Sequence, residues 1–188
     1  MKNYNATIMI VDDDPNDLFL IERALLKIGA TARIRPVNGG AEAIAYMIGE
    51  GKYADRSKYA YPTFICTDLK MPGVDGFSVL EHRKKDPVSS MIPTVVLTSS
   101  CDPDDIKKAY MLGACSYHVK PGSADALRAQ LKALYDYWMT CEIPEADSSG
   151  HQFLTDSQGK LGERYEQSRP GLSNNENPHG LCAKVVHQ

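Results

Sequence analysis

Short apolar runs alternate along the chain with longer segments in which apolar residues recur every three or four positions. A nearly continuous apolar run that stops at a turn-forming or charged residue is typical of a strand covered on both faces of a parallel sheet. The pattern therefore predicts five strands, at residues 6–11, 32–37, 64–66, 93–98 and 115–119.

A helix is predicted after each of these strands. Two of the helices begin with an Asp-Pro pair, at residues 14–15 and 102–103, which is typical of an N-cap followed by the first helical residue. The second helix is expected to bury Ile44 and Ile48. The predicted helices span residues 15–28, 41–48, 76–85, 103–112 and 124–141.

This alternation predicts an α/β fold with a parallel sheet and right-handed crossovers. We expect the flavodoxin-like, doubly wound (βα)5 arrangement with strand order 2-1-3-4-5, formed by residues 1–144. Residues 145–188 are rich in Ser, Gly, Asn, Glu and Gln without periodicity, so a flexible polar tail is predicted there. The polar connection at residues 49–61 is interpreted either as a functional loop or as a solvated surface excursion.

Composition narrows the class of function. The formal net charge of -3 argues against a nucleic-acid partner, because such proteins usually carry a basic stripe. No apolar run approaches the ~18 residues of a membrane span, and the first run meets Asp12 too soon for a signal peptide. The five cysteines are odd in number and widely spaced, so we expect reduced thiols in a cytoplasmic protein.

Polar side chains follow four of the predicted strands. Asp12 and Asp13 follow the first strand and Asp68 the third, while Thr98 and Lys120 stand at the ends of the fourth and fifth. The carboxyl ends of parallel strands meet at one edge of a sheet, where open α/β folds bind ligands. Each residue alone has an ordinary interpretation as a cap, a strand-end residue or a solvated charge. Their coincidence indicates a functional site.

The chemistry of such a site follows from its charges. Carboxylates at ~4 Å repel by roughly 4 kcal/mol a pair at an effective dielectric of ~20, so a proton or a cation is expected between them. Mg²⁺ suits carboxylates, waters and phosphate oxygens, whereas zinc calls for His or Cys, which these strand ends lack. A carboxylate beside Mg²⁺, a hydroxyl and an ammonium can accept a phosphoryl group and become an acyl phosphate.

Four motifs resemble those of the receiver domain of two-component response regulators. They lie at residues 11–15, 67–76, 97–99 and 117–121, in the family's order, and the resemblance covers about residues 5–143. It implies a signalling phosphoacceptor and not a conventional enzyme. The phosphoryl group would come from the phosphohistidine of a sensor histidine kinase or from a phosphotransfer protein.

The resemblance also implies roles for single residues. Asp68 would be the phosphoacceptor. Mg²⁺ would be held by Asp12, Asp13, Asp68 and the backbone carbonyl of Lys70. Pro121 would follow the lysine through a cis peptide bond. The phosphate-binding and switch residues would be Thr98, Ser99, Tyr117, Lys120 and Pro121.

A narrower resemblance is to the single-domain regulators of bacterial phytochromes, best known from cyanobacteria. It rests on the long connection before the third strand, the opening of the fourth helix and the Tyr137-Trp138 ending. The chain departs from these regulators in its long tail. It also departs at Ser99, where a small alanine is common, so their phosphoryl lifetimes do not carry over.

The last predicted helix carries more apolar surface than one sheet face needs. We therefore expect a homodimer through the fourth helix, the fifth strand and the fifth helix. The alternative is that the chain's own tail covers this surface. In the predicted helix, Leu127, Leu131, Leu134 and Trp138 would pack inward, and Tyr135, Tyr137, Met139 and Ile143 would stay partly exposed.

Other interpretations of the motifs stay open. A haloacid-dehalogenase-like phosphatase would use an Asp-x-Asp motif, which Asp12 and Asp14 satisfy, but it needs an acidic pair after the strand that ends at Lys120. Asp68 would also have no role in it. If the chain were a receiver-fold binding module that is not phosphorylated, the presence of Asp13, Asp68, Thr98 and Lys120 together would have no explanation. A flavodoxin would need a phosphate loop rich in Ser, Thr and Gly where this chain has three aspartates.

Overall fold

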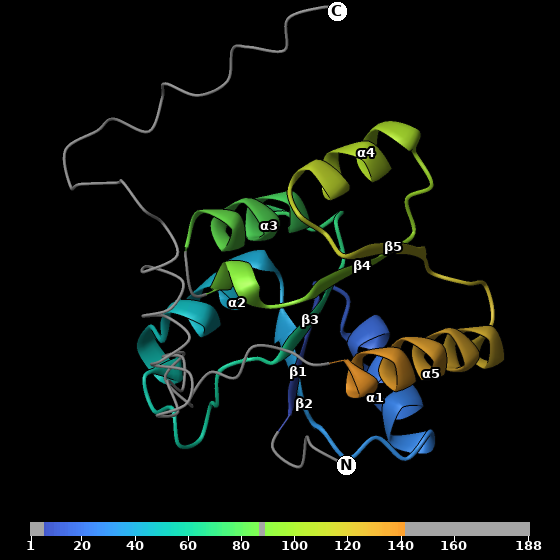
Figure 1. Cartoon of the computed structure of the whole chain (residues 1–188), viewed down its shortest axis with the longest axis horizontal. Coiled ribbons are helices and arrows are strands. Elements are labelled where there is room, and N and C mark those ends of the chain that lie inside the picture. Colours follow the sequence, from blue (N-terminus) through green and yellow to red (C-terminus); the bar gives the residue numbers. More distant parts are fainter. Residues whose placement is uncertain (1–5, 87–88, 142–188) are drawn as a thin grey trace, which may run out of the picture. The chain divides into compact units, whose positions relative to one another are not determined.

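A five-stranded parallel sheet forms the centre of the computed structural model, which describes residues 6–86 and 89–141 (Figure 1). The strand order is β2-β1-β3-β4-β5, and all four neighbouring pairs are parallel. The predicted fold and strand order are therefore confirmed. The tail predicted for residues 145–188 lies outside the described residues. The strands are Thr7–Asp12 (β1), Arg33–Asn38 (β2), Phe64–Thr67 (β3), Thr94–Thr98 (β4) and Ser116–Val119 (β5).

Helices cover both faces of the sheet, with α1 and α5 on one face and α2, α3 and α4 on the other (Figure 1). Within the described ranges, none of the helices is long and apolar enough to cross a membrane. Two single 3-10 turns, Gly51–Tyr53 (η1) and Ser89–Met91 (η2), lie in the connections before β3 and β4. The α-helices are Pro15–Lys27 (α1), Gly40–Ile48 (α2), Gly76–Lys85 (α3), Pro103–Met111 (α4) and Ala124–Thr140 (α5).

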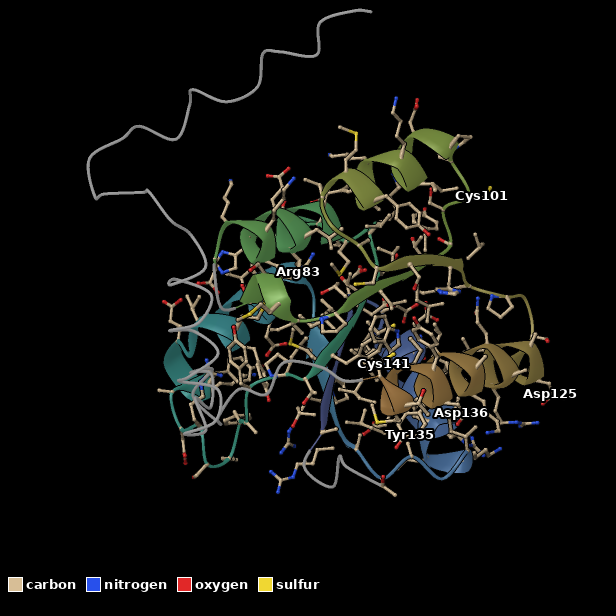
Figure 2. The ribbon with its side chains drawn as sticks, in the orientation of Figure 1. Arg83, Cys101, Asp125, Tyr135, Asp136 and Cys141 are labelled. Carbon is tan, nitrogen blue, oxygen red and sulfur yellow. The ribbon has the colours of Figure 1, made fainter. Side chains whose placement is uncertain are left out.

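The core between the sheet and the α1–α5 layer is apolar. Leu131 of α5 is fully buried, and the other members of the predicted stripe are partly buried against the same cluster. The ring of Trp138 lies 5.4 Å from that of Phe64, between centroids. Tyr135 projects from α5 toward the turn after α1 (Figure 2), where its hydroxyl accepts the backbone N–H of Thr31 at 2.9 Å. These contacts fix α5 along α1.

The core on the opposite face corrects one prediction. Ile48 is 55% exposed, and Ile44 is only partly buried. The residues of α2 that pack on the sheet, over β1 and β2, are instead Ala43, Tyr46 and Met47. The apolar pattern of this short helix fits more than one face, and tertiary packing selects the face one position earlier.

Three tyrosines of the connection at residues 49–61 pack on α2, while most of its other residues are exposed to solvent. Tyr53 and Tyr61 are buried. The ring centroids of Tyr46 and Tyr53 are 4.7 Å apart, and those of Tyr53 and Tyr59 are 5.0 Å apart. The Arg56 guanidinium donates at 2.7 Å to each of two backbone carbonyls in the last turn of α2. This segment therefore caps and covers the helix.

The start of α3 lies against the backbone that carries Asp68. A Cβ added at Gly76 would stand 2.0 Å from the Asp68 carbonyl oxygen and 2.8 Å from the Leu69 Cα. Real Cβ atoms do not approach that closely, and the neighbours are backbone atoms, so the helix must move. We expect Gly76→Ala to lower the free energy of unfolding by about 3 kcal/mol or more, measured by urea titration.

Gly122→Ala is the matched control, since a Cβ there meets no atom within 4 Å and the residue does not adopt a positive φ. It should change the unfolding free energy by less than about 0.5 kcal/mol or raise it slightly. Equal effects of the two substitutions would contradict the close packing of α3 on the loop after β3.

Candidate functional site

Three carboxylates meet at the carboxyl edge of the sheet, as the strand pattern predicts. Asp12 ends β1, Asp13 follows it, and Asp68 follows β3 directly. Their side-chain oxygens lie within 4.8 Å of one another. Asp12 and Asp68 are buried, and Asp13 is half-buried. Like charges this close are stable only with a cation or a proton among them.

Lys120, directly after β5, supplies one such cation. Its Nζ donates to Asp17 at 2.6 Å, to Asp12 at 2.7 Å and to Asp68 at 3.3 Å. Its backbone N–H donates to the carbonyl of Thr98 at 2.7 Å, which fixes the end of β5 beside β4. The contact with Asp17 is one that the sequence reasoning missed. No strand-end pattern marks Asp17, because it stands in the first turn of the helix that follows Asp12.

Burial and neighbouring charges shift the pKa values of Asp12 and Lys120. Burial raises the pKa of Asp12 above its ordinary value, and the hydrogen bonds from Lys120 and from the Asp14 backbone offset only part of that rise. Burial by itself would lower the pKa of Lys120, but its bonds to Asp12 and Asp17 and the charge of Asp68 outweigh burial, and the net pKa is raised. The ammonium is therefore a permanent charge of the site.

The two oxygens of Asp68 face different partners. Oδ1 accepts the backbone N–H of Leu69 at 2.6 Å and that of Lys70 at 3.4 Å. Oδ2 faces the ammonium of Lys120. The Thr67 hydroxyl donates to the Asp68 carbonyl at 2.8 Å and holds the backbone at this point. The carboxylate is thus oriented by the protein, with one oxygen directed at the lysine.

The remaining predicted residues line the β4–α4 side of the site. Thr98 is fully buried at the end of β4, and its hydroxyl accepts the backbone N–H of Ser100 at 3.4 Å. Ser99 is exposed and Tyr117 is half-buried. The Tyr117 hydroxyl donates to the Ser100 carbonyl at 3.0 Å. The loop after β4 is therefore bonded to both predicted switch residues.

A second set of contacts ties the loop after Asp68 to α4. The Lys70 ammonium pairs with Asp105 at 2.6 Å, and the Ser100 hydroxyl donates to the same carboxylate oxygen at 2.6 Å. The bonds from Lys70 and Ser100 lower the pKa of Asp105. The sequence reasoning assigned no role to Ser100 or Asp105, because neither stands at the end of a strand.

One implied feature is wrong. No cis peptide bond occurs in residues 6–86 or 89–141, so Pro121 follows Lys120 through a trans bond. The trans form is favoured by about 0.5–1 kcal/mol before proline. The trans geometry still delivers the lysine, since β5 already brings it to Asp12, Asp17 and Asp68.

The donor set of the acidic cluster decides what kind of ion it can hold. All three side chains offer oxygen, and no His or Cys joins the cluster within the described part of the chain. Hard divalent cations such as Mg²⁺ and Mn²⁺ prefer carboxylate oxygen, whereas zinc sites normally include His or Cys. The residues therefore fit the predicted divalent-cation site.

Asp14 takes no part in this cluster. It is exposed, and its Oδ1 accepts the backbone N–H of Asn16 at 2.8 Å as the N-cap of α1. The Asp-x-Asp pair that a dehalogenase-like phosphatase would use is therefore split between a buried site residue, Asp12, and a helix cap. This geometry argues against that alternative.

Comparisons with known proteins agree with the site. Residues 8–132 match the family model of the response regulator receiver domain. The chain is 33% identical over 132 residues to the probable methanogenesis regulatory protein FilR2 of Methanothrix harundinacea, covering 70% of this chain and 83% of that protein. It is 29% identical over 146 residues to the response regulator Rcp1 of Synechocystis, covering 77% and 97%.

Solved structures show the same likeness. The phosphorylated cyanobacterial phytochrome response regulator RcpA superposes with a TM-score of 0.70 at 33% identity, covering 75% of this chain and 99% of that one. The Mn²⁺-bound form of Rcp1 superposes with a TM-score of 0.68 at 28% identity, covering 74% and 99%. With the motifs, the fold and the acidic cluster in place, we conclude that the chain belongs to the response regulator receiver-domain family of two-component signalling, in which phosphorylation of an aspartate is typical.

Proposed function

We propose that Asp68 accepts a phosphoryl group from the phosphohistidine of a sensor histidine kinase or of a phosphotransfer protein. The observation that carries this proposal is the orientation of its carboxylate. Backbone N–H groups hold Oδ1, and Oδ2 faces the Lys120 ammonium beside two further carboxylates. An oriented carboxylate next to a fixed positive charge is what an acyl-phosphate acceptor requires.

In the proposed reaction an Asp68 oxygen attacks phosphorus while the bond from phosphorus to the histidine nitrogen breaks. The electron pair of that bond returns to the imidazole, and the product is an acyl phosphate. Lys120 donates an N–H to one phosphoryl oxygen, and Thr98 and Ser99 can serve the others. Asp12, Asp13, Asp68 and the Lys70 carbonyl would hold Mg²⁺. When bound, Mg²⁺ neutralises charge on the transferring group.

The response to phosphorylation would pass through the loop after β4. The Thr98 hydroxyl would turn toward the phosphoryl group, and the Ser100 backbone, bonded to both Thr98 and Tyr117, would follow. The loop after β4 would thus have two arrangements, before and after this movement. A phosphoryl group shifts the equilibrium between them only by making different contacts with each. Thr98 and Tyr117 are thus proposed as the two halves of one switch.

The kinase is proposed to be of the phytochrome type. The support is the likeness to Rcp1 and to the phytochrome regulator RcpA, together with the 49–61 connection and the α5 ending. A panel of purified, autophosphorylated histidine kinases tests this directly. Preferential transfer from phytochrome kinases is expected, and equal or slower transfer from them than from other kinases would overturn the assignment.

The test of the proposed function itself is phosphoryl uptake. The full chain is incubated with acetyl phosphate with and without Mg²⁺, and its intact mass is followed. We expect one phosphoryl group per chain, gained only when Mg²⁺ is present. If no gain occurs with Mg²⁺, either from acetyl phosphate or from any kinase of the panel, the proposed function fails.

We further propose a homodimer through α4, β5 and α5. Each of these elements exposes large apolar side chains, which are Tyr110, Met111, Val119 and Tyr137. A two-fold interface uses such a surface twice. Sedimentation of the full chain with and without beryllofluoride should therefore show dimers. Ile143 and the tail, which could cover this surface, lie outside the described residues.

Met111→Glu and Tyr137→Glu are each expected to weaken dimerisation at least tenfold, because a charge would be buried at the interface. Ile48→Glu is the matched control, since Ile48 is 55% exposed, close to the 60% of Tyr137, but lies on α2. A wild-type chain that stays monomeric with and without beryllofluoride, or a loss of dimers in the Ile48 variant alone, would refute this interface.

A further inference from the structure

The Lys120 ammonium has three N–H donors, and the structure shows a carboxylate partner for each. Nζ lies 2.6 Å from Asp17 Oδ2, 2.7 Å from Asp12 Oδ2 and 3.3 Å from Asp68 Oδ2. Lysine has no fourth donor. A phosphoryl oxygen on Asp68 can therefore receive an N–H from Lys120 only after one of these contacts opens.

The three contacts differ in how easily they can open. The side chains of Asp12 and Asp68 are 2% and 8% exposed, whereas that of Asp17 is 35% exposed. A buried carboxylate oxygen that loses the lysine has no water to replace that bond, whereas water can replace the lysine at an exposed carboxylate. The contact with Asp17 is thus the one that can open without leaving a buried carboxylate charge unpaired.

Asp17 also lies on a different element from the other two aspartates. It stands in the first turn of α1, after the N-cap Asp14, while Asp12 ends β1 and Asp68 follows β3. The shortest of the three contacts is to Asp17 and the longest is to Asp68. The ammonium is therefore drawn toward α1 and held back from the phosphoacceptor.

We propose that Asp17 is a positioning residue that tethers the Lys120 ammonium at the α1 side of the site and so slows phosphoryl acceptance by Asp68. This inference rests on the proposed function. Asp17 acts through Lys120 and does not touch the phosphoryl group. When the tether opens, the freed N–H turns to the phosphoryl oxygen.

The tether makes two predictions of opposite sign. In Asp17→Asn, the lysine is free to turn toward Asp68, and one negative charge near the anionic donor is lost. Phosphorylation by acetyl phosphate at saturating Mg²⁺ should become roughly threefold to tenfold faster. The untethered ammonium also competes with a cation for Asp12 and Asp68. Mg²⁺ binding without a phosphoryl donor, measured by calorimetry, should therefore weaken roughly twofold to fivefold.

Asp14→Asn is the matched control. It removes one negative charge from the same end of α1, asparagine retains the N-cap, and the bonds of the Asp14 side chain are to Asn16 and not to Lys120. Both measured quantities should change less than twofold. If Asp17→Asn changes them no more than Asp14→Asn does, or slows phosphorylation, the tether is refuted.

A third measurement separates this inference from the proposed function. The side-chain amine of Lys120 can be followed by nitrogen-15 NMR, without any phosphoryl donor. Three carboxylate partners should slow its hydrogen exchange, and Asp17→Asn should speed that exchange at least threefold, with no such change in Asp14→Asn. A wild-type chain that accepts no phosphoryl group refutes the proposed function alone. An unchanged amine exchange in Asp17→Asn refutes the tether alone.

Discussion

Asp68→Asn is expected to accept no detectable phosphoryl group from acetyl phosphate or from a kinase. The amide keeps the size of the carboxylate, and its oxygen can still accept the N–H of Leu69, which Oδ1 of Asp68 accepts at 2.6 Å. It lacks the negative oxygen that attacks phosphorus. The fold should therefore survive while the chemistry stops. Intact mass spectrometry with Mg²⁺ measures the loss, and peptide mapping of the wild-type adduct locates the acceptor.

Asp75→Asn supplies the matched control for this substitution. Asp75 lies in the same loop, but its Oδ1 caps α3 by accepting the N–H of Ser78 at 2.8 Å, a role that asparagine fills well. We expect it to keep its phosphoryl uptake. An adduct on Asp12, or normal uptake by Asp68→Asn, would show that the acceptor has been misassigned.

The parts of the site that could be predicted from the sequence are those that the backbone of the sheet delivers. Asp12, Asp68 and Thr98 each end or follow a nearly continuous apolar run, and parallel strands place the ends of such runs at one edge. A polar residue at the end of a buried strand has little packing reason to be there. This sequence signal predicts proximity in the structure because the parallel direction and the register of the strands follow from the fold.

Residues on helices carry no such signal. Asp17 is one of many acidic residues in a first helical turn, where a carboxylate is favourable without any partner. Its contact with Lys120 joins residues 103 positions apart and depends on where the first turn of α1 lies relative to the end of β5. Asp105 is a similar case, since its pairing with Lys70 depends on where α4 lies. Such pairings arise from the packing of helices against strands and not from local pattern.

Arg83 shows the same limit at a structural position. It stands in a basic run at the end of α3 that is typical of a solvated helix end, yet it is 5% exposed. Figure 2 labels it on α3, and its guanidinium donates to the carbonyls of Ser90, Ile92 and Gly113. It ties α3 to the segment before β4 and to the turn after α4. Only the tertiary structure distinguishes it from the exposed Lys84 and Lys85.

Asp13→Ala is expected to change the response of stability to Mg²⁺. Removing one of three mutually repelling carboxylates should raise the free energy of unfolding in EDTA by up to about 1 kcal/mol, since Asp13 is half-buried and partly screened. Mg²⁺ should stabilise the wild-type chain in proportion to its binding, because the folded state alone has the assembled site. The variant should gain almost nothing, with Mg²⁺ affinity at least ~100-fold weaker and phosphoryl uptake lost.

Urea titrations in EDTA and in Mg²⁺ measure both effects. Asp13→Ala should be the more stable protein in EDTA, and the wild type should be the more stable in Mg²⁺. Asp14→Asn again serves as the control, because it removes an exposed charge next to Asp13 and keeps the cap of α1. It should respond to Mg²⁺ as the wild type does. The assignment of Asp13 to the metal site would be wrong if Mg²⁺ stabilised Asp13→Ala as much as the wild type. It would also be wrong if the variant still accepted the phosphoryl group at the normal rate.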